Sequence, residues 1–204
     1  VRVSYSSLEL VDDFEDLKHE LVREAMRLTG VTSGVEITTI AEIPSRGTGL
    51  GSSSTVTVGL LNALHKFAGR DASPAQLAEE ACLIEIDILG QPIGRQDQYA
   101  AAFGGLNAFS FDSKGVRVEP IIVSCESQIR DEFTLVFTGL SRSASEVLSE
   151  VPRDLNNKLT RLRRIRNQAD IAEQFLNEGE LSKLGILIGE AWHEKRGISA
   201  GVSG

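Results

Sequence analysis

The chain has 204 residues, 41% apolar and 25% charged, which is ordinary for a globular protein and excludes a disordered or collagen-like chain. Its 21 lysines and arginines against 29 aspartates and glutamates give a net charge of −8, which together with 5% aromatic residues argues against a nucleic-acid surface. Because no apolar stretch reaches the roughly 18 to 20 residues of a membrane span, and because Cys82 and Cys125 lack the spacing of a disulfide framework or zinc site, we expect a cytoplasmic protein.

Strands and helices alternate in the first part of the chain. Apolar and polar residues alternate over 1–5, which predicts a half-buried strand. Leucines and alanines at helical spacing predict a helix over 12–29, with Gly30 as its C-terminal stop. A second strand is expected over 35–40, which is rich in Val, Ile and Thr.

Three helices should follow this second strand. The first comes after a glycine- and serine-rich loop and carries an apolar stripe from Leu60 to Phe67. The second begins at Ser73, because Ser73-Pro74-Ala75-Gln76 combines an N-cap serine with a first-turn proline and a capping-box glutamine, and it should run to about Leu89. A short third helix is expected over 98–103, before Gly104 and Gly105.

The second half of the chain should begin with strands and end with helices. We expect a domain boundary near Lys114-Gly115, which divides the chain into 1–114 and 115–204. The predicted strands span 106–111, 116–123 and 133–138, and the predicted helices begin at Ser141 or Ser143, at Asp154 and at Glu180. Basic residues between Lys158 and Arg166 alternate with leucines at helical spacing, which indicates a solvated helix face.

The loop from Gly47 to Ser54 reads Gly-Thr-Gly-Leu-Gly-Ser-Ser-Ser and lies between a predicted strand and a predicted helix. Free backbone N–H groups converge at such a place, and the helix dipole favours an anion there. Glycines let the backbone approach a phosphate, while serine hydroxyls can donate to phosphate oxygens or bind magnesium. The alternative is a tight turn with no ligand, and the Walker pattern is absent. The run of three serines favours the phosphate interpretation, since one serine is enough to cap a helix.

Glu85 is the carboxylate whose position is hardest to explain by structure alone. At about 100° per residue it projects into the apolar arc of its helix, whereas the other acids of that helix project to the opposite side. The arc contains Leu77, Ala81, Ile84 and Ile88, and the acids outside it are Glu79, Glu80 and Asp87. A carboxylate that faces a core needs a metal ion or an arginine. A structural salt bridge or an exposed helix end are the alternatives.

A second acid, Asp97, lies in Gly94-Arg95-Gln96-Asp97-Gln98, close to the small residues 100–102. Asp97 beside Arg95 is either a surface pair or an aspartate that a cation keeps ionised for use as a general base. Two carboxylates and a phosphate-binding loop together suggest magnesium-assisted phosphoryl transfer. The histidines His19, His65 and His193 are expected at surface or helix-end positions and outside the chemistry.

The loop resembles the second motif of the GHMP family of small-molecule kinases, which reads proline, three residues and then Gly-Leu-Gly-Ser-Ser. Here Pro44 is followed by four residues and then by Gly49-Leu50-Gly51-Ser52-Ser53. Within this family, the segments Gly94 to Gly105 and Thr138 to Ala144 are similar to those of heptose-phosphate kinases. Counterparts of the family's first and third motifs would lie outside this chain, which we therefore expect to be a fragment.

The resemblance implies an α+β fold of two lobes, an N-terminal lobe like ribosomal protein S5 domain 2 and a ferredoxin-like C-terminal lobe. It also implies ATP and Mg²⁺ as cofactors, with Ser53 and Glu85 holding the metal and Asp97 facing the sugar hydroxyl as the catalytic residue. Thr138 and Arg142 match positions near the transferring phosphate or the substrate. The ATP phosphates would lie at Gly47, Gly49, Leu50, Gly51, Ser52, Ser53 and Ser54.

The function expected from this resemblance is phosphoryl transfer from ATP to a hydroxyl of D-glycero-D-manno-heptose 7-phosphate. The alternatives are a kinase for another acceptor, such as fucose, galactose or mevalonate, and a catalytically silent module that binds a nucleotide or a sugar. We expect a sugar phosphate and ATP as partners, with neither nucleic acid nor membrane, and leave homodimer formation open. Binding alone needs neither a base nor a buried metal ligand, so Asp97 and Glu85 distinguish the kinase from the silent module.

Overall fold

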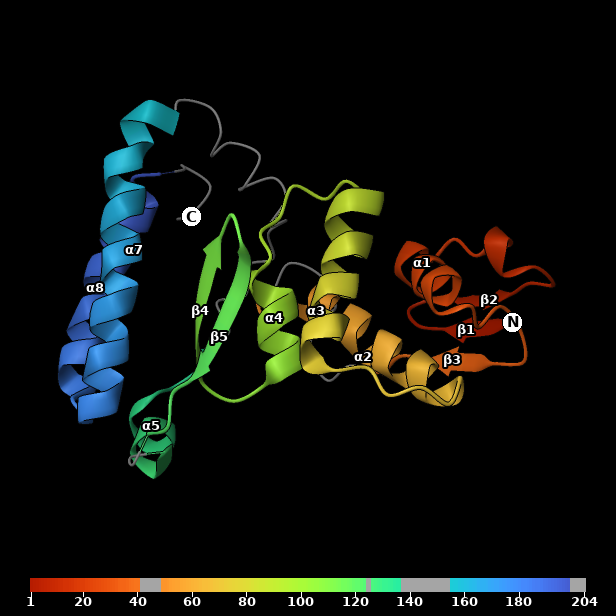
Figure 1. The fold of residues 1–204 in the computed structure, drawn as a ribbon, viewed down its shortest axis with the longest axis horizontal. Helices are drawn as coiled ribbons and strands as arrows, with labels where there is room; N and C mark the ends of the chain where they lie inside the picture. Colours follow the sequence, from red (N-terminus) through yellow and green to blue (C-terminus); the bar gives the residue numbers. More distant parts are fainter. Residues whose placement is uncertain (41–48, 124–125, 137–154, 199–204) are drawn as a thin grey trace. The chain divides into compact units, whose positions relative to one another are not determined.

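A computed structural model of the chain describes residues 1–40, 49–123, 126–136 and 155–198. Strands and helices are both present, as the predicted α+β class requires (Figure 1). The chain divides into two compact units, Val1–Gly104 and Gly105–Gly204. Among the described residues, no helix combines the length and the apolar character needed to cross a bilayer.

The first unit begins with a three-stranded sheet in the order β2-β1-β3, made of β1 (Arg2–Ser4), β2 (Leu8–Leu10) and β3 (Glu36–Thr38). β1 pairs antiparallel with β2 and parallel with β3, so that Val3 lies opposite both Glu9 and Ile37. The predicted strands over 1–5 and 35–40 are confirmed. β2 was not predicted, because its three residues are too few to show an alternation.

The predicted helix over 12–29 is wrong in its first half. Residues Phe14–Asp16 form a separate 3₁₀ turn, η1, which Asp13 caps by accepting a hydrogen bond from the backbone N–H of Glu15 at 3.0 Å. The helix itself, α1 (Glu20–Thr29), begins only after Leu17 adopts an extended backbone. The predicted stop is confirmed, because Gly30 follows α1 at φ 72°.

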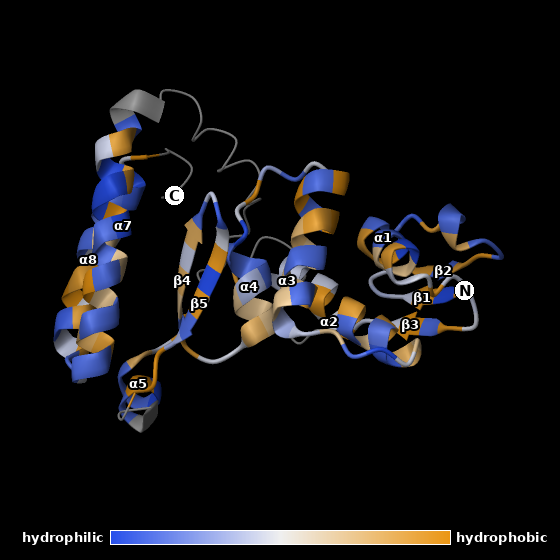
Figure 2. Cartoon of the chain, viewed as in Figure 1, coloured by the Kyte–Doolittle hydropathy of each residue, from blue (hydrophilic) through white to orange (hydrophobic). Residues whose placement is uncertain are grey.

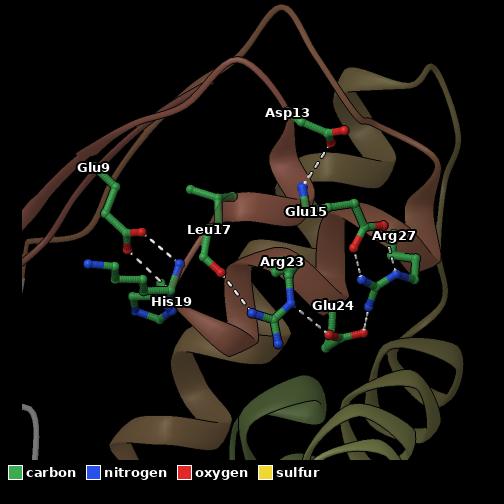
Figure 3. Close-up of polar contacts among 9 residues, drawn as sticks. Glu9, Asp13, Glu15, Leu17, His19, Arg23, Glu24 and Arg27 are labelled. Atoms are coloured by element: carbon green, nitrogen blue, oxygen red, sulfur yellow. Dashed lines mark hydrogen bonds and ion pairs between the residues drawn. The ribbon is translucent and has the colours of Figure 1, made fainter.

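A buried acid on α1 holds this part of the unit together (Figure 3). Glu24 is 4% exposed and accepts hydrogen bonds from Arg23, at 3.1 Å, and from Arg27, which also pairs with Glu15. Burial would raise the pKa of the Glu24 carboxyl, but the hydrogen bonds from Arg27 and Arg23 outweigh burial and hold that pKa below its ordinary value. Arg23 also donates to the carbonyl oxygen of Leu17 at 2.7 Å, which ties α1 to the segment before it.

Three helices pack beside one another in the same unit: α2 (Ser52–Phe67), α3 (Pro74–Cys82) and α4 (Gln96–Phe103). Their apolar faces and that of α1 form one core, to which Leu61, Leu64, Leu77 and Ala81 contribute. The three predicted helices are confirmed. So is the N-cap at Ser73, whose hydroxyl accepts from the backbone N–H of Gln76 at 3.2 Å.

His65 lies in the last turn of α2, which confirms the helix-end position expected for it, but it is buried, so the surface alternative is wrong. Its Nε2 lies 2.7 Å from a carboxylate oxygen of Glu80 on α3, and its Nδ1 accepts from Arg70 at 3.3 Å. Arg70 in turn donates to the carbonyl oxygen of Thr29 at the end of α1. The imidazole therefore links three helices, which is a structural role.

The second unit opens with a hairpin of β4 (Asn107–Asp112) and β5 (Gly115–Pro120), which pair antiparallel over their full length. The division expected near Lys114-Gly115 falls in the turn of this hairpin, and its two strands belong to the same compact unit. Helix α5 (Glu126–Glu132) was not predicted. The strand expected over 133–138 is wrong for its described part, since 133–136 have no regular secondary structure.

Two long helices complete the described part of the second unit: α7 (Leu155–Glu178) and α8 (Leu181–Arg196), as the sequence predicts. Glu194 on α8 accepts hydrogen bonds of 2.9 Å from both Arg161 and Arg164 on α7, and the pKa of its carboxyl lies below the ordinary value chiefly because of Arg164. Hydrophilic residues cover much of α7 (Figure 2). The interpretation of the basic run as a helix face is confirmed, and this face also binds the neighbouring helix.

The ion pairs of Glu24 generate a prediction about stability. Glu24→Gln should lower the free energy of unfolding at pH 7 by about 1 to 3 kcal/mol, because it replaces the buried anion shared by two arginines with a neutral amide that has a single acceptor oxygen. Since the folded-state pKa of Glu24 is lowered, its contribution is present above the ordinary value of 4.5 and is lost as the pH falls below it. Urea unfolding of both proteins between pH 3 and 7 measures the difference.

The control is Glu36→Gln, which removes an exposed acid paired with Arg2. An exposed pair is worth about 0 to 1 kcal/mol, so this variant should unfold almost like the parent. Equal losses in the two variants, or a loss in Glu24→Gln that does not shrink as the pH falls from 7 to 3, would contradict the buried-pair account.

Candidate active site

Two glycines of the glycine-rich loop, just before α2, have a left-handed backbone conformation. Gly49 has φ 72°, and Gly51, the N-cap of α2, has φ 63°. A glycine N-cap has no side chain to bond the amides of the first helical turn, and the first N–H groups of a helix have no intrahelical acceptor. Helix α2 is 16 residues long, so its dipole adds positive potential at this end. The N-terminal end of α2 is therefore suited to bind an anion.

Glu85 is 1% exposed, which confirms that its carboxylate faces inward. Oε1 accepts a hydrogen bond from the Ser53 hydroxyl at 2.5 Å, and Oε2 accepts one from the amide of Gln98 at 2.6 Å. Neither donor carries a charge. Among the ion pairs of the described residues, none includes Glu85, so the salt-bridge alternative does not account for its burial.

The helix that carries Glu85 becomes π-helical at Leu83. Residues Leu83–Ile88 form the π-helical segment η2, in which the N–H of Leu89 bonds to the carbonyl oxygen of Ile84, five residues earlier, at 2.9 Å. The projection at 100° per residue holds up to Glu85. It is wrong for Ile88, which is 48% exposed, because the wider turn rotates the later residues out of the predicted arc.

Asp97 lies against the loop. A Cβ atom placed on Gly51 would lie 3.2 Å from Cγ of Asp97 and 3.3 Å from its Cβ, so the backbone of the loop and the carboxylate are in direct proximity. The Asp97 side chain is exposed, whereas the neighbouring Gln98 is completely buried. The first turn of α4 thus presents one residue to the loop and the next one to Glu85.

Arg95 does not pair with Asp97. Its guanidinium binds Glu79 on α3 and lies 5.7 Å from the ring centroid of Tyr99, whose hydroxyl also donates to Glu79. Burial and this bond to Glu79 raise the pKa of Tyr99 to about 12. The surface pair of Asp97 with Arg95 is therefore wrong, because the acid on α3 is the partner that Arg95 reaches. The use of Asp97 as a general base stays a prediction.

The remaining predicted site residues fall into two groups. Leu50 is exposed, whereas Ser54 is buried, with 3% of its surface accessible. Gly47, Thr138 and Arg142 lie outside the described residues. The structure thus brings together Gly49, Gly51, Ser53, Glu85 and Asp97.

Residues 17–105 match the family model described as GHMP kinases N terminal domain. This match contains every described residue of the candidate site. The segment is a GHMP kinase N-terminal domain. The resemblance stated from the loop and from Gly94 to Gly105 is therefore confirmed at the level of the family.

Two relatives of known name are similar to this chain over nearly its whole length, and a third is similar over a shorter part. The D-glycero-alpha-D-manno-heptose 7-phosphate kinase of Campylobacter jejuni is 29% identical over 198 residues, which are 95% of this chain and 57% of that protein. The L-fucokinase/L-fucose-1-P guanylyltransferase of Bacteroides fragilis is 27% identical over 98% of this chain and 20% of its own length. A mevalonate kinase of Methanothermobacter thermautotrophicus is 35% identical over 89 residues, 28% of its length.

A solved structure shows the same fold. It is that of a D-glycero-D-manno-heptose 1-phosphate kinase from Bacteroides thetaiotaomicron, with a TM-score of 0.75 and 23% identity over 96% of this chain and 63% of that one. The GHMP kinase fold predicted from the resemblance is thereby confirmed. Each of these three matches includes nearly all of this chain. The chain nevertheless spans only about one fifth to three fifths of the length of the matched proteins.

Gln98 is the residue of this site that sequence reasoning missed. The motif Gln96-Asp97-Gln98-Tyr99 drew attention to the acid, whereas the glutamine next to it received no role. A signal was present, because Gln98 precedes Ala101 and Ala102 by three and four residues and so shares their face of the helix.

The contact between the loop and Asp97 predicts unequal effects of two glycine substitutions. Gly49→Ala and Gly51→Ala each force an alanine into the left-handed region, at about 1 to 2 kcal/mol of unfolding free energy. Gly51→Ala should lose about 1 kcal/mol more, because its Cβ meets Asp97, whereas no atom of the described residues lies within 4 Å of a Cβ placed on Gly49. Urea unfolding of the two variants provides the comparison, and equal losses would show that the Asp97 side chain yields freely.

Proposed function

We propose that this chain is the nucleotide-binding part of an ATP-dependent kinase that phosphorylates a hydroxyl of a sugar or sugar phosphate. The observation that carries the proposal is the meeting of three features at the N-terminal end of α2: the left-handed Gly51, the Ser53–Glu85 hydrogen bond and the adjacent Asp97. A module that only binds a nucleotide has no need of the last two. The kinases among its relatives support the same activity.

The loop is proposed to bind the ATP phosphates through backbone N–H groups of residues 49–54. A glycine N-cap and a long helix dipole favour an anion at this point. The buried Ser54 would contribute at most its backbone N–H, whereas Ser52 is half-buried and Ser53 is exposed. Gly47 belongs to the same proposal through the family resemblance.

Ser53 and Glu85 fit a magnesium ion. The pair supplies one hydroxyl and one carboxylate, the oxygen ligands that Mg²⁺ takes, and Mg²⁺ at phosphate sites is held by one or two carboxylates together with phosphate oxygens and water. The described residues contain no cluster of three or more acidic, histidine or cysteine side chains that could form a complete protein cage. When bound, the ion would neutralise charge on the phosphates and on the otherwise uncompensated Glu85.

Asp97 is proposed to orient the acceptor hydroxyl and to take its proton. Its exposed carboxylate lies next to the loop, within the space where an acceptor would meet the transferring phosphate. Arg95 binds Glu79 instead, so the arginine does not pair with the Asp97 carboxylate. Positioning then carries most of the effect, and general base catalysis of this kind contributes about 10² to 10⁴ in rate.

The proposed acceptor is D-glycero-D-manno-heptose 7-phosphate, phosphorylated at its anomeric hydroxyl. Support comes from the similarity to the Campylobacter jejuni kinase over 95% of this chain and from the segment Gly94 to Gly105. Thr138 and Arg142 are proposed to contact this substrate or the transferring phosphate. A phosphoryl-transfer assay of the intact protein with heptose 7-phosphate, fucose, galactose and mevalonate tests the acceptor, and transfer to none of them would favour the silent binding module.

The first functional prediction concerns Asp97. Asp97→Asn keeps the size of the side chain and removes its charge, so turnover of the intact protein should fall by about two orders of magnitude or more. Nucleotide affinity should change little, because Asp97 is assigned to the acceptor. Steady-state kinetics and ADP titration measure the two quantities. The control is Asp12→Asn, another exposed acid of the same unit. Near-normal turnover in Asp97→Asn would reduce Asp97 to a scaffold residue.

The second functional prediction concerns Glu85. Glu85→Gln preserves the shape of the side chain but removes the negative charge, so the Mg²⁺ concentration at half-maximal ADP binding should rise at least about tenfold. Calorimetric titration of ADP at a series of Mg²⁺ concentrations measures this midpoint. Asp87→Asn, which changes an exposed acid two residues away, should leave it unchanged. An unaltered midpoint in Glu85→Gln would remove Glu85 from the metal site.

A further inference from the structure

The side chain of Gln98 has one polar atom that makes a hydrogen bond and one that makes none among the described residues. The side chain is 0% exposed, and its amide nitrogen donates to Oε2 of Glu85 at 2.6 Å. Its amide oxygen is buried and has no hydrogen-bond partner among the described residues. A buried acceptor without a partner costs about 1 to 3 kcal/mol, so this residue is not explained by packing stability alone.

The orientation of the Gln98 amide follows from its neighbour. Turning the amide over would place two acceptor oxygens against each other, since an ionised carboxylate cannot donate. The nitrogen must therefore face Glu85, and the oxygen must point elsewhere in the buried region. A methionine or leucine of similar volume would fill the same space without burying an unpaired acceptor oxygen. The bond to Glu85 is therefore the feature that distinguishes glutamine at this position.

We propose that Gln98 is a positioning residue for Glu85, holding its carboxylate in the orientation that meets the metal ion. This inference rests on the proposed role of Glu85 as a magnesium ligand. Ser53 and Gln98 bond to different oxygens of the carboxylate from different helices, α2 and α4. Gln98 fixes the orientation without being a ligand itself, in the way that groups bonded to metal ligands commonly do.

The arrangement also couples the two acids of the site. Asp97 and Gln98 are successive residues in the first turn of α4, one against Gly51 and the other against Glu85. The spacing between the acid that meets the acceptor and the carboxylate that meets the metal is thus set by a rigid helical turn. Loss of the Gln98 bond frees Glu85 to rotate while Asp97 stays in place.

The test is Gln98→Met, which keeps a long side chain and removes both the donor and the orphaned oxygen. In the intact protein we expect the Mg²⁺ midpoint for ADP binding to rise about 10- to 100-fold, the range typical of groups bonded to metal ligands. The affinity for ADP measured in EDTA should not change, which a general structural defect would not permit. Gln96→Met, an exposed position in the same helical turn, is the matched control and should leave the midpoint unchanged.

A double-mutant cycle with Glu85→Gln separates this inference from the proposed function. If Gln98 acts through Glu85, adding Gln98→Met to Glu85→Gln should raise the midpoint no further. If Glu85→Gln shifts the midpoint and Gln98→Met does not, the positioning role is overturned while the metal role of Glu85 stands. If Glu85→Gln itself has no effect, the metal role fails, and the positioning role fails with it.

Folding of the variant is monitored by its urea transition, and Gln98→Leu provides a second variant. A cooperative transition with a raised Mg²⁺ midpoint in either variant supports the inference. Loss of the cooperative transition in both would overturn it in favour of a purely structural role for Gln98.

Discussion

The buried carboxylate of Glu85 is the constraint on which the candidate site depends. Removing a carboxylate from water is costly unless hydrogen bonds and an opposite charge compensate for it. The protein supplies two hydrogen bonds, from Ser53 and Gln98, and among the described residues it supplies no cation. A divalent ion would compensate the negative charge of this carboxylate. The bond to Ser53 also places the carboxylate next to the helix end where phosphates are proposed to bind.

The two donors explain why α2, α3 and α4 pack as they do around this acid. Ser53 is the second residue of α2, and Gln98 is the third residue of α4, so both helices begin at the site. The π-helical segment adds to this arrangement, because Glu85 faces inward while the wider turn rotates Ile88 outward within one short stretch. π-helical segments are rare and occur mostly at functional sites, which agrees with a local winding that serves to position Glu85.

Sequence patterns predicted the parts of this structure that local chemistry controls. The N-cap at Ser73, the stop at Gly30 and the inward face of Glu85 depend on residues a few positions apart, and all three are confirmed. Features that depend on distant partners were missed. Arg95 pairs with an acid sixteen residues away, and His65 is buried by contacts from two other segments, so neither position could be read from its own neighbourhood.

The two acids of the site differ in their surroundings, and this difference bears on their roles. Glu85 is enclosed and held by two donors, which restricts it to one orientation and suits a fixed ligand. Asp97 is exposed and lies against a glycine that offers no side chain, so an acceptor can approach it directly. Paired carboxylates in different environments commonly divide their tasks in this way. Asp97 is neither buried nor paired with Arg95, which binds Glu79 instead. Its contribution to catalysis must therefore come from its location beside the phosphate loop.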